Sequence, residues 1–178
     1  IDGGLCNIGV ESTVVDCTTP VPTLLRPGGI TAEMLVDTLG EIEIDPTLNG
    51  SADYVPRSPG MKYTHYAPIA PMILIEGLQP QAENLLLKEI QSAIEKGQKV
   101  GAIVSAQTAE KLPGAVVAAV YGQRLQTDEI AANLYTALRS FDDCPIDVIY
   151  AEGISEEGLG LAIMNRLRKA SGYKIIKV

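Results

Sequence analysis

Aromatic residues, histidine and long apolar runs are scarce in this 178-residue chain. With no tryptophan and a single phenylalanine, its cores must be built mainly from Val, Ile, Leu and Ala, as in parallel α/β sheets. No apolar run reaches the roughly 18 residues of a membrane-spanning helix, and the first residues lack the basic region of a secretory signal. The sequence therefore predicts a cytoplasmic protein with no membrane association.

Cysteine is also scarce, and its spacing argues against a structural metal site. Cys6, Cys17 and Cys144 form no C-x-x-C pair, and with one histidine in the chain a zinc site of Cys and His is not expected. An odd number of cysteines without such spacing is typical of reduced thiols. We expect each cysteine to be buried among apolar side chains. We therefore predict no protein-bound metal.

Basic residues are few in the first part of the chain, whose formal net charge as a whole is −8. Residues 1–71 contain nine acidic and only three basic residues, namely Arg26, Arg57 and Lys62. Because phosphate binding needs cations, this balance argues against general nucleic-acid binding. If RNA is a partner, a local patch must bind it, so the places of these few cations matter.

Five further cations gather near the end of the chain. They are Arg166, Arg168, Lys169, Lys174 and Lys177. Such a run would contact tRNA if it formed a patch, but a solvated helix face is the more common reason for it and is the favoured interpretation.

Residues 1–45 contain too few elements to fold alone. Strands are expected over 10–17, 23–26 and 41–45, and a helix over 32–39. Thr31 is the predicted N-cap of that helix and Gly40 its end. A hairpin, one short helix and one edge strand bury little surface, so we expect this segment to be the last part of an incomplete α+β domain.

Residues 46–71 form a long proline-rich connection without helical or strand periodicity. Long segments of this kind inside compact proteins are usually functional or disordered. The segment gathers four unusual residues for a linker: Lys62, Tyr63, His65 and Tyr66. Proline stiffens the backbone, so the segment could lie across a pocket as a lid with its Lys and His facing phosphates. The alternative is a linker whose tyrosines pack on a domain surface.

From residue 72 onward, short apolar strands alternate with amphipathic helices. Strands are expected at 72–75, 100–104, 115–121, 147–150 and 174–178, and helices at 81–96, 108–111, 128–140 and 159–171. This alternation is typical of a Rossmann-like α/β domain, with a parallel sheet and helices on both faces. The chain is thus divided into three parts, 1–45, 46–71 and 72–178.

Ser12 and Arg26 are the candidate ligand contacts of the first part. If Arg26 faces Ser12 in the predicted hairpin, its guanidinium would match a phosphate or carboxylate with two hydrogen bonds. A surface ion pair with Asp16 is the alternative for Arg26, and a hydrogen bond to nearby backbone is the common role of a serine such as Ser12.

The segment 153–160 separates a predicted strand from a predicted helix, where parallel sheets bind anions or small ligands. Its two glutamates argue against phosphate, and a tight turn is the favoured explanation of its glycines. The chain contains neither a G-x-G-x-x-G motif after a strand nor a G-x-x-x-x-G-K-[ST] loop.

Five segments of the chain resemble, in order and spacing, the Sua5 family of threonylcarbamoyl-AMP synthases. They are residues 1–4, 9–16, 25–31, 58–68 and 158–170. The segment 58–68 is the most specific of them, with its Lys-Tyr-x-His-Tyr-x-Pro core. The resemblance implies the end of a YrdC-like catalytic domain, a linker and a C-terminal Sua5 domain.

The reaction that the resemblance implies is a nucleotidyl transfer. L-Threonine, bicarbonate and ATP give threonylcarbamoyl-AMP and pyrophosphate for N6-threonylcarbamoyladenosine (t6A) modification of tRNA, so tRNA and the downstream t6A-synthesis proteins are indirect partners. Mg²⁺ is expected with ATP, held largely by phosphates and water. By resemblance, Ser12 contacts threonine and Arg26 contacts the nucleotide phosphates. The linker residues expected to close over ATP are Lys62, Tyr63, His65 and Tyr66.

The chain departs from the family pattern in one respect. The family's Lys-x-Arg and Ser-x-Asn motifs, which hold substrate, lie upstream of the matching part, and neither occurs before Ile1. We therefore expect this segment to be inactive alone. The alternative interpretation is that the chain is not part of a synthase. In that case residues 72–178 form a module that binds a nucleotide or a small regulatory ligand at the ends of its strands.

Overall fold

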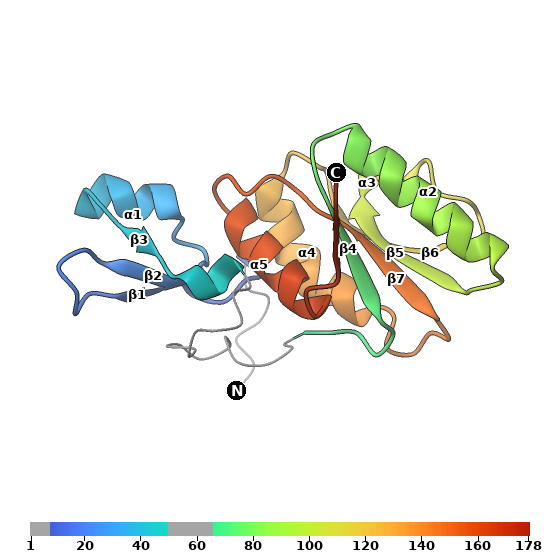
Figure 1. Ribbon diagram of the computed structural model, residues 1–178, viewed down its shortest axis with the longest axis horizontal. Helices are drawn as coiled ribbons and strands as arrows, with labels where there is room; N and C mark the ends of the chain where they lie inside the picture. Colours follow the sequence, from blue (N-terminus) through green and yellow to red (C-terminus); the bar gives the residue numbers. More distant parts are fainter. Residues whose placement is uncertain (1–7, 50–65) are drawn as a thin grey trace.

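The structure is a computed structural model, and it describes residues 8–49 and 66–178. Two separate sheets organise these residues (Figure 1). The first is three-stranded and lies in the chain before residue 49, and the second is five-stranded and begins at Met72. We refer to them as the three-stranded part and the five-stranded part.

The three-stranded part contains the predicted hairpin and helix. Its elements are β1 (Val14–Asp16), β2 (Thr23–Arg26), α1 (Ala32–Leu39), β3 (Glu43–Ile44) and the 3-10 helix η1 (Pro46–Asn49). β1 pairs antiparallel with β2, and β3 pairs parallel with β2. As predicted, Thr31 caps α1, and Gly40 ends it at a φ of +86° that favours glycine.

Two predictions for this part were wrong in detail. β1 is shorter than expected, since β2 ends at Arg26, the residue that pairs with Val14, so Ser12 lies before the strand. The proline-rich connection also begins with a helical turn, η1, which was not predicted. Asp45 caps this turn by accepting a hydrogen bond from the backbone N–H of Thr47 at 2.9 Å, a cap signal that the prolines obscured.

The five-stranded part has the predicted alternation of strands and helices. Its strands are β4 (Met72–Glu76), β5 (Val100–Ser105), β6 (Val117–Gly122), β7 (Val148–Glu152) and β8 (Ile175–Lys177). Its helices are α2 (Gln81–Glu95), α3 (Ala106–Ala109), α4 (Thr127–Arg139) and α5 (Gly160–Ala170). The strand order is β6-β5-β7-β4-β8 and every pair is parallel, which confirms the α/β class.

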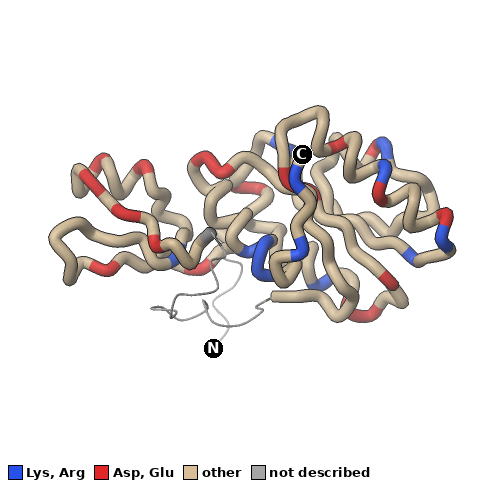
Figure 2. Tube along the Cα trace, in the orientation of Figure 1, with Lys and Arg blue, Asp and Glu red and all other residues tan. Residues whose placement is uncertain are grey.

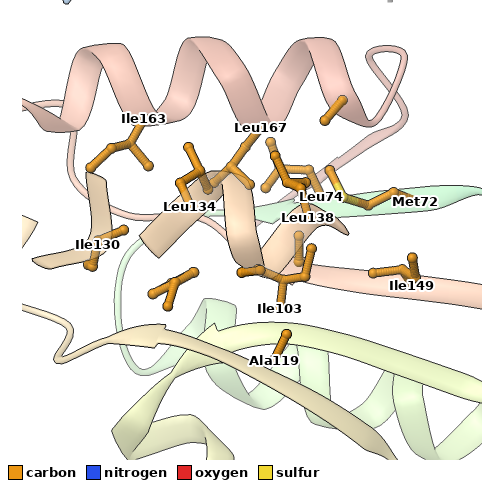
Figure 3. Packing of buried hydrophobic residues seen from close by; sticks show 14 of the residues in the cluster. Met72, Leu74, Ile103, Ala119, Ile130, Leu134, Leu138, Ile149, Ile163 and Leu167 are labelled. Carbon is orange, nitrogen blue, oxygen red and sulfur yellow. The ribbon is translucent and has the colours of Figure 1, made fainter. Parts of the chain in front are cut away.

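Helices cover both faces of this sheet, as predicted. α2 packs on one face, whereas α4 and α5 pack on the other (Figure 1). In Figure 3, Ile163 and Leu167 of α5 point toward Leu134 and Leu138 of α4 above the sheet. The sheet contributes Met72, Leu74, Ile103, Ala119 and Ile149 to this cluster. Apolar burial of this kind, at about 25 cal/mol per Å², is the main force that holds α5 in place.

The prediction that each cysteine is buried was wrong for Cys17, which is exposed. Cys17 follows β1 directly, at the turn of the hairpin, where residues 17–20 are all exposed. Cys144 is half-buried, and both thiols are free. Cys6 lies outside the described residues. Within the described ranges, no helix is both long and apolar enough to cross a membrane.

Candidate functional site

The three-stranded part meets α5 at a charged contact. Six residues define this contact, which we call the junction site: Glu11, Ser12, Arg26, Tyr66, Arg166 and Lys169. In Figure 2, basic residues of α5 lie near the boundary with the three-stranded part, whose charged residues are mostly acidic. Two of the site's cations thus come from a segment far along the chain from the other residues.

Arg26 and Ser12 face each other, as the hairpin prediction required. Arg26 is the last residue of β2, and its Nε donates to the carbonyl oxygen of Ser12 at 3.0 Å. Its Nη2 donates to the Ser12 hydroxyl oxygen at 3.1 Å. The guanidinium is therefore fixed against Ser12, whose side chain is exposed.

A close turn after β2 holds this arrangement. The Thr13 hydroxyl donates to the Ile30 carbonyl at 2.6 Å and accepts from the Ile30 N–H at 3.0 Å. Gly28 lies directly against the chain at Glu11, since a Cβ added there would be 2.3 Å from the Glu11 carbonyl oxygen. Only glycine permits this approach, which keeps residues 11–13 and 27–30 side by side.

Arg166 of α5 contacts both of these backbone segments. Its Nε donates to Glu11 Oε2 at 2.8 Å, and its Nη1 donates to the Pro27 carbonyl oxygen at 2.6 Å. Glu11 precedes Ser12 and Pro27 follows Arg26, so one buried guanidinium fixes the neighbours of both predicted ligand contacts.

Charge and burial shift the pKa values in the junction site. Burial opposes ionisation of Glu11, but the positive charge of Arg166 and the hydrogen bonds that the carboxylate accepts together outweigh it and leave the pKa of Glu11 below its ordinary value. Lys169 is 6% exposed. Its burial, reinforced by repulsion from Arg166 and Arg26, lowers the pKa of Lys169 to about 8. Lys169 therefore holds its proton weakly for a lysine.

A larger cavity opens beside the junction site. Its volume is about 530 Å³, and it shares Glu11, Tyr66 and Arg166 with the junction site. Tyr66 has a φ of +67°, which is rare for a residue other than glycine, and its ring meets Tyr135 of α4 edge-on with centroids 5.4 Å apart. The cavity is within the 300–1,000 Å³ or so that is usual for small-molecule sites.

Sequence reasoning found part of this site and missed the rest. Ser12 and Arg26 are brought together, and Tyr66 lines the same cavity as Arg26. Lys62, Tyr63 and His65 lie outside the described residues, so their expected place over ATP stays a prediction.

The residues that the sequence analysis did not identify as part of the site are Glu11, Arg166 and Lys169. Both interpretations of the cations near the end of the chain were wrong for Arg166, Arg168 and Lys169, which are buried rather than solvated or available to RNA. One signal was available. Ile163 and Leu167 face the core, but Ala162, Arg166 and Lys169 form a second stripe at helical spacing.

A second candidate site lies at the carboxyl ends of β4 and β7. These strands are neighbours, and the loops after them lead to helices on opposite faces, α2 and α5. The loops enclose a crevice of about 460 Å³, which includes residues 76–79 and 153–156. A parallel sheet binds ligands at such a divergence of connections. We call this the carboxyl-end crevice.

Ion pairs occupy the floor of the carboxyl-end crevice. Arg168 pairs with Glu76 at 2.8 Å and with Glu156 at 2.6 Å. Arg124 pairs with Glu83 at 2.6 Å and with Glu152 at 3.0 Å. Each arginine thus has two carboxylates, and the crevice has no excess of positive charge. Within residues 8–49 and 66–178, no group of three or more His, Cys, Asp or Glu side chains is arranged to hold a metal ion.

A protein-family model identifies the class of protein to which most of the chain is similar. The family model described as "Threonylcarbamoyl-AMP synthase, C-terminal domain" matches residues 30–172. The five-stranded parallel sheet with helices on both faces agrees with the solved structure of an isolated C-terminal Sua5 domain from Pyrococcus horikoshii, at 38% identity and a TM-score of 0.50. That match covers 63% of this chain and 100% of that one. The fold and the family match together indicate the C-terminal half of such a synthase.

Similarity extends through the rest of the chain. It is 48% identical to threonylcarbamoyl-AMP synthase of Pyrococcus abyssi, over 100% of this chain and 50% of that protein. It is 45% identical to the Bacillus subtilis synthase, over 99% of this chain and 49% of that protein. The crystal structure of P. abyssi Sua5 complexed with L-threonine matches with a TM-score of 0.87 and 48% identity, over 99% of this chain and 50% of that one. The chain belongs to the Sua5 family of threonylcarbamoyl-AMP synthases, and it spans about half the length of the curated relatives it matches.

Proposed function

We propose that the protein containing this chain makes threonylcarbamoyl-AMP and pyrophosphate from L-threonine, bicarbonate and ATP. The observation that carries the proposal is 45–48% identity, along almost the whole chain, to two proteins named threonylcarbamoyl-AMP synthase. In this proposal, residues 1–45 end a YrdC-like catalytic domain, 46–71 are the linker and 72–178 are the C-terminal domain. The product serves t6A modification of tRNA, and the protein acts in the cytoplasm.

The proposed roles of the site residues follow from their chemistry. Ser12 hydrogen-bonds L-threonine, and Arg26 meets the phosphates of ATP, which enters with its Mg²⁺. The threonine amine attacks bicarbonate with loss of water, and a carbamate oxygen then attacks the α-phosphorus of ATP as the bond to pyrophosphate breaks. Such a transfer depends mainly on positioning and charge stabilisation, which a fixed guanidinium supplies.

The linker residues complete the proposed ATP site. Lys62 and His65 face the phosphates, and Tyr63 and Tyr66 close over the nucleotide, so that water is kept from a hydrolysis-prone product. A solved variant of P. abyssi Sua5 replaces a histidine and the next tyrosine by alanine. In this chain the single histidine, His65, is likewise followed by Tyr66.

Pyrophosphate release by the full-length protein tests the proposed reaction. We expect release that requires ATP, L-threonine and bicarbonate together, and none from residues 1–178 alone. Failure of a folded full-length protein to release pyrophosphate would refute the synthase assignment. Release by residues 1–178 would instead show that these residues suffice for the reaction.

The carboxyl-end crevice favours a second candidate function, a small-ligand-binding module in residues 72–178. Its polar floor is charge-balanced, and two leucines that line it, Leu78 and Leu125, are 82% and 92% exposed. Carboxylates and apolar side chains together suit an uncharged ring compound with hydroxyl or amino donors better than a phosphate.

Thermal unfolding of this chain with 5 mM or so of adenosine or AMP distinguishes the two functions by mass action. The module predicts a higher Tm with adenosine, no rise with AMP, and loss of the effect in Leu125→Ser. The same Tm with and without adenosine would remove the support for this candidate.

A further inference from the structure

We propose that Tyr135 of helix α4 is a positioning residue for the synthase reaction, because its ring holds Tyr66 at the junction site. Tyr135 would then assist nucleotide binding through Tyr66, without contacting the nucleotide. The role of Tyr66 as an ATP contact rests on the proposed function, whereas the contact between the two rings does not.

The first argument is the backbone conformation of Tyr66. Its φ is +67°, in the left-handed region that bulky residues rarely adopt. A residue in this region persists only where the surrounding structure holds it, and such residues gather at ligand sites. Tyr66 is half-buried, and it lines both the small cavity that contains Arg26 and the larger cavity beside it. A displacement of Tyr66 would therefore change the walls of both cavities.

Tyr173 provides an internal comparison, since its φ is +60°. It follows the end of α5, where its N–H donates to the Arg168 carbonyl oxygen at 2.9 Å and the N–H of Gly172 donates to the Lys169 carbonyl oxygen at 3.0 Å. A helix commonly ends with bonds of this kind, so the segment around Tyr173 accounts for its conformation. At Tyr66 a constraint comes instead from another element, α4.

The constraint is the ring of Tyr135. The two rings meet at an interplanar angle of 77° with centroids 5.4 Å apart, a T-shaped geometry that aromatic pairs favour. Tyr135 is 47% exposed, and the neighbouring Leu134 and Leu138 form the buried side of the helix. The core under α4 thus does not require a tyrosine at position 135, whereas the contact with Tyr66 does use its ring.

The same helix supports the chain before Ser12. Gly9 has a φ of +67°, and a Cβ added there would be 2.3 Å from the Ala131 carbonyl oxygen of α4. Only glycine permits so close an approach. Both Tyr66 and the segment that leads to Ser12 therefore rest on α4, so the helix is a fixed base from which Tyr135 can hold a ring.

The ring of Tyr135, rather than its hydroxyl, carries the proposed role. Arg139 donates to that hydroxyl at 3.5 Å and lies 5.6 Å from the ring centroid. Its side chain is exposed and pairs with Asp142, and contacts of exposed charges contribute little. Phenylalanine at position 135 would keep the contact with Tyr66 and lose only the bond to Arg139.

Kinetics of the full-length protein test the role of Tyr135. We expect Tyr135→Ala to raise KM for ATP about three- to tenfold, the usual value of an aromatic pair, while kcat and KM for L-threonine stay unchanged. Tyr135→Phe should keep wild-type kinetics. Tyr173→Ala, at a tyrosine that is 43% exposed, is the matched control and should keep them too. An unchanged KM for ATP in a folded Tyr135→Ala protein, or an equal rise in both KM values, would overturn the proposal.

A double-mutant cycle shows whether Tyr135 acts through Tyr66. We expect Tyr66→Ala to raise KM for ATP, and the addition of Tyr135→Ala to the same protein to raise it no further. Additive effects of the two substitutions would refute this route of action.

Fluorine NMR of the full-length protein labelled with 3-fluorotyrosine separates the ring contact from the reaction. The Tyr66 signal is assigned by its loss in Tyr66→Phe. We expect this signal to shift in Tyr135→Ala, because a neighbouring ring is removed, and to stay in place in Tyr173→Ala. An unmoved signal in Tyr135→Ala would refute the contact. A shift in a wild-type protein background that releases no pyrophosphate would confirm the contact but refute the synthase reaction, and with it the role of Tyr135.

Discussion

Replacing Arg26 by alanine should lower kcat/KM for ATP of the full-length protein by about a hundred- to a thousandfold. A fixed cation that meets developing charge on the transferred phosphoryl group typically contributes this much. Arg26 suits the role because two hydrogen bonds to Ser12 hold its guanidinium in one place. Pyrophosphate release at several ATP concentrations measures the effect.

Three further variants show whether the loss is specific. Arg26→Lys should restore little activity, since lysine keeps the charge but not the planar fork. Ser12→Ala should act mainly on KM for L-threonine. Arg139→Ala, at an exposed arginine paired with Asp142, should leave the kinetics unchanged. Wild-type kinetics in a folded Arg26→Ala protein would exclude Arg26 from the ATP site.

Replacing Glu152 by alanine should lower the free energy of unfolding by about 3–5 kcal/mol, the usual cost of breaking a buried ion pair. The Glu152 side chain is 2% exposed. Its Oε2 accepts from the N–H and hydroxyl of Ser105, both at 2.8 Å, and its Oε1 accepts from Arg124 Nε at 3.0 Å. Without the carboxylate, buried donors at the end of β5 lose their acceptor.

Urea unfolding followed by circular dichroism measures this change in the 178-residue chain. Glu152→Gln should lose less, because an amide oxygen still accepts from Ser105 but cannot pair with Arg124. Glu110→Ala, at an exposed glutamate, is the matched control and should change stability by less than about 0.5 kcal/mol. A loss below about 1 kcal/mol for Glu152→Ala would contradict the network's role.

The α/β fold was predictable because its signals are local. Apolar strands and amphipathic helices alternate along residues 72–178, and each predicted element is present with bounds that differ by a few residues. The caps of α1 at Thr31 and Gly40 were equally local. The irregular pairing at Val14 was not predictable in this way, since it depends on how two strands meet.

The junction site was only partly predictable, for a related reason. Arg26 and Ser12 are 14 positions apart on one hairpin, so their contact follows from short-range structure. Arg166 and Glu11 are 155 positions apart, and nothing near Arg166 in sequence marks its partner. A buried basic residue on a helix resembles a solvated one until the element that covers it is known.

The two opposite stripes of α5 restrict how this protein can be recombined with its relatives. One stripe packs into the core of its own sheet, and the other carries Arg166 and Lys169 to the three-stranded part. A chimaera that takes residues 72–178 from another species would therefore take the residue at position 166 from one protein and its partner Glu11 from the other. Such a chimaera should be functional only when its donor supplies an arginine that matches Glu11, so domain exchange in this family is a matter of compatible charges as well as compatible folds.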